Sequence, residues 1–252
     1  ATISINTEVD LTKMQKTITG LYSNRAGNYR KLERDSGFII SKNLVKQLEQ
    51  CIQITNLLIY GVPNIEETID LSGCIKLEKI DITENTIKFI LPEGLKTLTG
   101  QNYTIPNIDL CINTIETIHQ NQMHNGTTVE DFTEMCKKLR NSTSLKTMIF
   151  TPVMDFDFSG LKYLSGSSID TISITRNPSW FGTFTNMKNV DLRKPSDYIE
   201  GTPHFNNLKS LALEYTTIES MENFKDCTAL EYIRITNSTI NDISALANMP
   251  NL

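Results

Sequence analysis

The stretch Leu208-Lys-Ser-Leu211-Ala-Leu213 returns 22 residues later as Leu230-Glu-Tyr-Ile233-Arg-Ile235, and Leu252 stands another 22 residues on. Apolar residues then keep the same register in both units: Ile218 with Ile240, Met221 with Ile243, Phe224 with Leu246, and Cys227 with Met249. A fixed period of this length indicates a repeat architecture. Apolar residues at alternate positions within each unit predict a short strand with one buried face.

The same pattern occurs upstream with less regular spacing. The units are Ile54-x-x-Leu57-x-Ile59, Leu77-x-x-Ile80-x-Ile82-x-x-Asn85, Leu95-x-x-Leu98, Leu145-x-x-Met148-x-Phe150, Ile169-x-x-Ile172-x-Ile174-x-x-Asn177 and Met187-x-x-Val190-x-Leu192. The pattern is weakest between residues 100 and 144. One such unit cannot bury its own apolar face, so neighbouring units must stack and share a continuous core.

We therefore predict an α/β fold of the leucine-rich-repeat type over residues 54–252. This is a solenoid with a curved parallel sheet on one side and irregular, 3-10 or helical returns on the other. Residues 1–53 are predicted to form a helical N-terminal cap, with helices from Asp10 to about Thr19 and after Ser41. Because Leu252 occupies the first position of another unit, we expect the array to be truncated at the C-terminus.

A helical insertion is predicted near residues 127–141. Thr127-x-x-Glu130 and Thr128-x-x-Asp131 are both capping-box frames. Phe132, Met135, Cys136 and Leu139 follow at helical spacing, and basic residues occupy the last turn. We expect this helix to pack on the returning side of the solenoid.

Two kinds of junction resemble known bacterial repeats. Gly73-Cys74-Ile-Lys-Leu77-Glu-Lys-Ile80 and Asp226-Cys227-Thr-Ala-Leu230-Glu-Tyr-Ile233 resemble the junction of BspA-like surface repeats. Ile240-Asn-Asp-Ile243-Ser-Ala-Leu246-Ala-Asn-Met249-Pro-Asn-Leu252 is similar to internalin repeats. The resemblance implies a secreted or cell-surface bacterial recognition protein, and it carries over no catalytic residue. The irregular middle of the chain matches neither subfamily closely.

Composition limits the classes of partner. A formal net charge of −5 disfavours a general nucleic-acid or anionic-membrane binder. No apolar run approaches the ~20 residues of a membrane span, and no signal peptide is visible. The five cysteines, at positions 51, 74, 111, 136 and 227, have neither CxxC nor zinc-site spacing. We predict buried thiols, with a disulfide or a reactive thiol as the alternative.

Candidate catalytic or metal-binding residues are few. Glu116, His119 and His124 lie close together, but their spacing fits no helical zinc motif, so we predict loop residues. Asp155-Phe-Asp157-Phe partly matches a calcium loop, although the alternating phenylalanines favour a core role. The basic stretch 24–35 is predicted to be a solvated loop, with contact to an anionic partner as the alternative. We predict no enzymatic activity, no cofactor and no metal site.

The remaining candidate is the outward face of the predicted strands, which repeat proteins commonly present to partners. We predict a partner-binding patch near its C-terminal part, because tyrosine and arginine are enriched at binding hot spots. Its members are Asp191, Arg193, Glu214, Tyr215, Tyr232 and Arg234. Ordinary solvated strand residues are the alternative. The expected function is recognition of an unidentified protein outside the cell. An intracellular interaction scaffold or effector, whose activity lies outside this chain, is the alternative, and the oligomeric state is left open.

Overall fold

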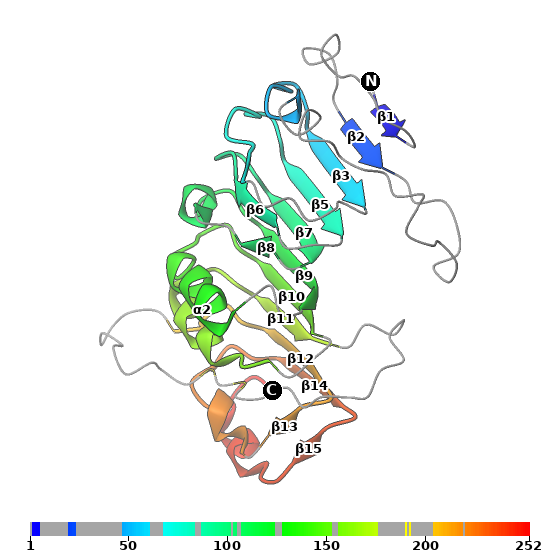
Figure 1. The fold of residues 1–252 in the computed structure, drawn as a ribbon. Helices are drawn as coiled ribbons and strands as arrows, with labels where there is room; N and C mark the ends of the chain where they lie inside the picture. The colour runs from blue at the N-terminus through cyan, green and yellow to red at the C-terminus, as the bar shows by residue number, and fades with distance from the viewer. Residues whose placement is uncertain are drawn as a thin grey trace, which may run out of the picture.

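The computed structural model describes residues 2–5, 20–23, 47–60, 68–83, 87–101, 103–104, 107–123, 128–152, 156–175, 190, 192, 204–218 and 220–252. Ten strands form one parallel sheet, which we call the main sheet, and they lie in chain order (Figure 1). These strands are β1 (Thr2–Ile5), β2 (Gly20–Ser23), β3 (Asn56–Tyr60), β5 (Lys79–Thr83), β7 (Thr97–Gln101), β9 (Thr117–Met123), β10 (Thr147–Pro152), β11 (Thr171–Ile174), β12 (Ser210–Glu214) and β14 (Tyr232–Thr236).

The chain returns between these strands through short elements on the other side of the coils. Two small parallel sheets lie there, one of β4 (Ile69–Asp70), β6 (Ile87–Ile90) and β8 (Tyr103–Thr104), the other of β13 (Thr217–Ile218) and β15 (Thr239–Ile240). The helical returns are η1 (Ile108–Cys111), α2 (Val129–Lys138), η2 (Ser159–Gly166), η3 (Met221–Phe224) and η4 (Ser244–Asn248). Figure 1 shows α2 on the side away from the main-sheet strands. This is the leucine-rich-repeat-like solenoid that the repeat pattern predicts.

The repeat spacing is visible directly in the strand register. Leu211 of β12 pairs with Ile233 of β14, and Leu213 pairs with Ile235, so the 22-residue period places equivalent residues side by side. Within β12, Leu211 and Leu213 are buried while Ser210, Ala212 and Glu214 are half-buried. The apolar positions therefore face the core, and the intervening positions form an outward face.

The core is a continuous column between the main sheet and the returns. Each coil contributes the leucine or isoleucine that opens its unit, and Leu77, Leu95, Leu145, Leu208 and Leu230 are all fully buried. Where α2 covers the column, Phe132 makes edge-on contacts with three other rings at 5.3–5.6 Å between centroids. Those rings belong to Phe150, Phe156 and Phe158. Phe156 and Phe158 are thus core residues, as their alternation predicts.

Helix α2 begins at the second of the two capping-box frames, with Thr128 as its N-cap. The Thr128 side chain accepts a hydrogen bond from the Asp131 backbone N–H at 3.0 Å. Lys137 and Lys138 lie in the last turn, where cations interact favourably with the helix dipole. Cys136 points inward and is fully buried.

Three predictions of element position need correction or fall outside the described chain. First, β1 and β2 lie within residues 1–53 and extend the main sheet before Ile54, where we expected the sheet to begin. The helix predicted for 10–19 lies outside the described residues. Of the helix predicted after Ser41, residues 47–51 are described: 47–48 are helical and 49–50 form a turn. Asn85, Asn177 and the basic stretch 24–35 also lie outside the described residues.

Second, β9 is a strand that the sequence pattern did not reveal. Its unit reads Ile115-x-x-Ile118-x-Gln120, so a buried glutamine occupies the position where an apolar residue was expected. His119, predicted to lie in a loop, is therefore a half-buried strand residue. Glu116 directly precedes the strand and is exposed, and His124 lies outside the described residues.

Third, the unit predicted at Met187–Leu192 supplies no strand to the main sheet, because β11 pairs directly with β12. Val190 and Leu192 are buried, as the pattern requires, but they contact the returning side. The Leu192 backbone N–H donates to the Asn223 carbonyl at 2.9 Å, and Asn223 Nδ2 donates to the Val190 carbonyl at 3.5 Å. Val190 and Leu192 are therefore buried on the returning side of the coil and not in a strand of the main sheet.

Candidate binding surface

The outward face of the main sheet carries rows of side chains that run across the strands. The first row consists of residues paired in register: Lys79, Thr97, Thr117, Thr147, Thr171, Ser210 and Tyr232. Four consecutive threonines followed by a serine give this row a uniform hydroxyl character. β-branched threonine suits a half-buried strand surface, so the row by itself is explained by strand stability.

The C-terminal part of the face differs in chemistry. Tyr232 follows the hydroxyl row and is 55% exposed, which is unusual for so large an apolar ring. Arg234 lies two residues further along β14, is exposed, and is paired in register with the small Ala212. Both side chains are exposed, so a partner can reach the Arg234 guanidinium and the Tyr232 ring.

The structure brings together only part of the predicted patch. Glu214, Tyr232 and Arg234 belong to the adjacent strands β12 and β14, and Glu214 accepts a hydrogen bond from Asn237 Nδ2 at 3.3 Å. Tyr215 follows β12 in a left-handed conformation (φ 56°), and its half-buried ring packs against the core. Asn237, the equivalent residue of the next coil, also has a positive φ of 51°. Tyr215 therefore forms part of a recurring turn.

Asp191 and Arg193 lie outside the described residues. Their neighbours Val190 and Leu192 pack on the returning side, and no strand intervenes between β11 and β12. We predicted that both residues extend the patch across a third strand, and this prediction required a strand between β11 and β12. We therefore define the strand-face patch as Glu214, Tyr232 and Arg234.

His119 lies in the second row of the outward face, between Thr99 and Ile149. Burial lowers its pKa from the ordinary histidine value. Its Nε2 atom is buried and has no hydrogen-bond partner among the described residues. Asp81, in the same row one strand beyond Thr99, has its pKa raised by burial. This middle part of the face thus favours the uncharged forms of His119 and Asp81. Among the described residues, no carboxylate or thiol is hydrogen-bonded to His119 Nε2.

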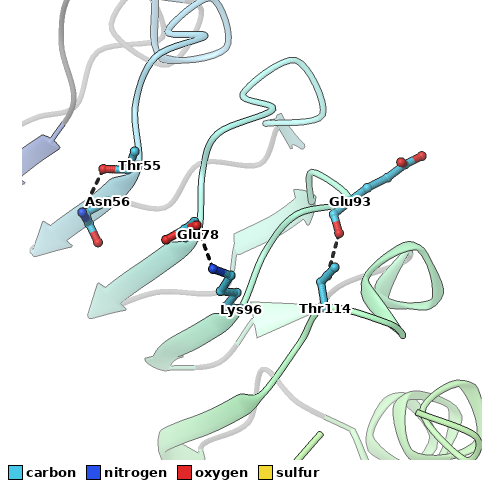
Figure 2. A network of polar contacts seen from close by, with 6 residues as sticks. All are labelled: Thr55, Asn56, Glu78, Glu93, Lys96 and Thr114. Atoms are coloured by element: carbon cyan, nitrogen blue, oxygen red, sulfur yellow. Dashed lines mark hydrogen bonds and ion pairs between the residues drawn. The ribbon is translucent and has the colours of Figure 1, made fainter. Parts of the chain in front are cut away.

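A second pattern, absent from our sequence expectations, lies along the edge where the strands begin. The residue just before each strand alternates in charge through seven consecutive coils, and we call this set the charge ladder. Its members are Glu78, Lys96, Glu116, Lys146, Asp170, Lys209 and Glu231. Lys96 Nζ lies 2.8 Å from Glu78 Oε1 (Figure 2), and Lys209 Nζ lies 2.9 Å from Glu231 Oε1.

The backbone beneath the charge ladder is equally regular. The carbonyls of the first six ladder residues each accept two N–H groups from the next coil, so that the Glu78 carbonyl binds the N–H groups of Lys96 and Thr97, both at 2.9 Å. The pKa of Lys96 is raised first by its hydrogen bond to Glu78 and also by the nearby charge of Glu116. A lysine of the ladder thus interacts with the acid on each side. Reading the residue after each opening leucine or isoleucine would have revealed the alternation from the sequence.

The cysteines are buried thiols. None of the five forms a disulfide, and all are buried. Burial raises the pKa of Cys51 to about 11, of Cys74 to about 12 and of Cys111 to about 11. The pKa of Cys136 is raised further by the same cause. Thiols of this kind are poor nucleophiles at neutral pH, because the thiolate is scarcely populated.

The described part of the chain contains no group of three or more histidine, cysteine, aspartate or glutamate side chains placed to hold a metal ion. None of its helices combines the length and the apolar character needed to cross a bilayer.

Comparisons with known proteins find a distant likeness in structure. No protein-family model matches the chain, and no curated protein matches it. Among solved structures, the chain is similar to an internalin (inlF) from Listeria monocytogenes, with 14% sequence identity and a TM-score of 0.39. That likeness covers 82% of this chain and 67% of the internalin chain. The strand register and repeat spacing described above, rather than this distant likeness, identify the fold.

Proposed function

We propose that this chain is a protein-recognition module that binds its partner through the outward face of the main sheet, centred on the strand-face patch. The observation that carries the proposal is Tyr232, which is 55% exposed beside the exposed Arg234. An exposed tyrosine next to an arginine combines an apolar ring with a charged donor, the pair of residue types most often found at hot spots. The neighbouring hydroxyl row offers further hydrogen-bonding groups along the same face.

A cell-surface or secreted bacterial location is part of the same proposal. Its support is the sequence resemblance of the junctions at Cys74 and Cys227 to BspA-like repeats, and of the run from Ile240 to internalin repeats. The partner would then be a protein of a host or of a neighbouring cell.

An intracellular interaction scaffold is the second candidate, and one observation favours it. None of the five cysteines forms a disulfide, which is typical of a reducing compartment. The two locations are distinguished by brief protease treatment of intact producing cells followed by mass spectrometry. Peptides from residues 204–252 released without lysis support the surface location, and their protection until lysis supports the scaffold.

Photo-crosslinking tests the binding face itself. Benzoylphenylalanine replaces Tyr232 in one protein and Leu110 in a control protein. The control position lies in η1 on the returning side and is 48% exposed, close to the exposure of Tyr232. We expect a discrete crosslinked protein from position 232 that is missing from position 110. Identical products from both positions, or no product from position 232, would contradict the proposal.

A further inference from the structure

The middle of the charge ladder differs from its two outer parts. In the outer parts a lysine forms an ion pair with a neighbouring acid, Lys96 with Glu78 and Lys209 with Glu231. Among the described residues, the three middle members form no ion pair. These members are Glu116, Lys146 and Asp170, which directly precede β9, β10 and β11. The middle of the ladder therefore presents an acid, a base and an acid that a partner can pair.

The backbone holds these three charges in a fixed row. The Glu116 carbonyl accepts the N–H groups of Lys146 and Thr147 at 2.9 and 3.1 Å, and the Lys146 carbonyl accepts those of Asp170 and Thr171, both at 3.0 Å. Consecutive members of the row are thus spaced like hydrogen-bonded strands, about 4.8 Å apart. Glu116 and Lys146 are exposed and Asp170 is half-buried, so the first two are the members most accessible to a partner.

The spacing of the row selects the kind of partner. Successive charges are matched only by a partner whose own side chains recur at about 4.8 Å. A β-strand laid along the row presents same-face side chains about 6.6 Å apart, and a helix presents one face every ~5.4 Å. Both lose register with the row over a few coils. Another stack of parallel strands keeps register, and a second copy of this chain is such a stack.

The alternation also makes the ladder complementary to itself. We consider a two-fold axis that crosses the ladder between β9 and β10, so that the ladders of two copies face each other and run antiparallel. Glu116 of each copy then faces Lys146 of the other. The outer pairs are Asp170 with Lys96 and Glu78 with Lys209. An acid faces a lysine at each of these positions, which is the self-complementarity that a two-fold interface requires.

We propose that the charge ladder is a second interaction surface, through which two copies of this chain associate with Glu116 of each copy against Lys146 of the other. The complementary charges fix the orientation of the two copies more than they add affinity. The dimer is weak and sensitive to salt, because exposed ion pairs contribute little and are screened. The ladder lies along the edge where the strands begin, so it is separate from the strand-face patch.

The test measures self-association of the whole chain by sedimentation equilibrium, at concentrations up to about 1 mM because the expected complex is weak. We expect a reversible monomer–dimer equilibrium at about 0.05 M NaCl that weakens at about 0.5 M. Lys146→Glu and Glu116→Lys should each weaken the dimer by at least about tenfold, since two attractive pairs become repulsive. Lys88→Glu makes the same change at an exposed position of β6 outside the ladder, and it should leave the equilibrium unchanged.

A mixture of the Lys146→Glu and Glu116→Lys proteins tests the two-fold arrangement itself. Each variant alone places like charges opposite each other at positions 116 and 146. In a mixed dimer, both pairs are again an acid against a lysine, so the mixture should associate about as strongly as the unchanged chain. Circular dichroism melting verifies that each variant folds. A loss of folded protein cannot produce this restoration, because mixing does not alter the stability of either variant.

Three outcomes would overturn the proposal. The first is a chain that stays monomeric at all concentrations and at low salt, and the second is a dimer that Lys146→Glu leaves unchanged. The third is a mixture of the two variants that associates no better than either variant alone. None of these outcomes bears on the crosslinks formed at Tyr232, which test the strand-face patch separately.

Discussion

At the scale of single residues, the outward face combines exposed side chains with a few whose pKa values are shifted by burial. His119 is the clearest of these, because its Nε2 atom is buried without a partner among the described residues and its pKa is lowered by burial. A histidine with a lowered pKa is held in its neutral form at neutral pH. The middle of the outward face is therefore less hydrated than the C-terminal part around Arg234.

His119 should make stability depend on pH. Since its folded-state pKa lies below the unfolded value, the unfolded chain binds more protons as pH falls through the ordinary histidine range. The free energy of unfolding should thus fall between about pH 7.5 and about pH 5.5. The His119→Gln protein cannot take up that proton, so its free energy of unfolding should fall less between the two pH values. Urea denaturation at each pH measures this difference. An equal fall in both proteins would contradict the assignment.

At the scale of elements, the helical return formed by α2 and η2 depends on close backbone approach. A Cβ built at Gly160 in η2 would lie 2.8 Å from Thr133 Oγ1 and 3.0 Å from Thr133 Cα in α2. One of these atoms is backbone, so the two elements must separate to accept even a methyl group. Glycine at this position is what lets α2 cover the cluster of aromatic rings around Phe132.

Gly160→Ala should therefore reduce the free energy of unfolding by about 1–3 kcal/mol, the usual cost of overpacking. Gly94→Ala is the matched control, since its Cβ would meet only the Ile75 carbonyl at 3.5 Å, an ordinary contact. That variant should be neutral or slightly stabilised, by up to about 1 kcal/mol. Urea denaturation of the two variants measures both effects. Equal stability of the two would show that α2 and η2 do not approach as described.

Also at the element scale, the success of sequence reasoning depended on how regular each coil is. The strands β12 and β14 follow from Leu208 and Leu230, because the residues after them repeat without a gap. β9 escaped the pattern because Gln120 is buried where the template requires an apolar residue. The stretch around Val190 was wrongly predicted to be a strand of the main sheet, because Val190 and Leu192 are buried beside η3, to which they are hydrogen-bonded. A periodic pattern indicates which residues are buried, but only the structure shows which neighbouring elements bury them.

For the candidate site, too, the sequence predicts the position of some residues and not of others. Tyr232 and Arg234 could be placed on the outward face from the repeat alone, and the structure has them there on β14. Tyr215 could not, because the sequence does not reveal that the strand ends at Glu214 and that Tyr215 has a positive φ. The charge ladder was visible in the sequence, but its significance depends on consecutive coils being hydrogen-bonded neighbours.

At the scale of the whole molecule, the charge ladder favours one stacking order of the coils. Each lysine lies between two acids, so any shift of a coil by one place would put like charges side by side. The individual pairs are exposed and weak. Their regular alternation matters because the coils are otherwise similar in their apolar positions. The ladder therefore contributes to the register of the coils.

Lys96→Glu tests this role of the ladder. The substitution places three acids on consecutive coils, and we expect it to lower the free energy of unfolding at low salt. The loss should shrink between about 0.05 M and about 0.5 M NaCl, because salt screens exposed charges. Lys88→Glu makes the same charge change at an exposed position of β6, outside the ladder, and should have a smaller effect. If both variants lose the same stability at low salt, the ladder has no specific role.

The whole molecule presents its strands as one continuous face, and we propose that this face binds a protein at Tyr232 and Arg234. The most direct test is the affinity of the crosslinked partner, purified, for the double variant Tyr232→Ala/Arg234→Ala, compared with Leu110→Ala/Lys225→Ala on the returning side. We predict that the first double variant weakens binding by at least about thirtyfold, the loss of one hot spot, while the second leaves it unchanged. Affinities of the two double variants that agree within about twofold, well below a hot-spot effect, would contradict the account.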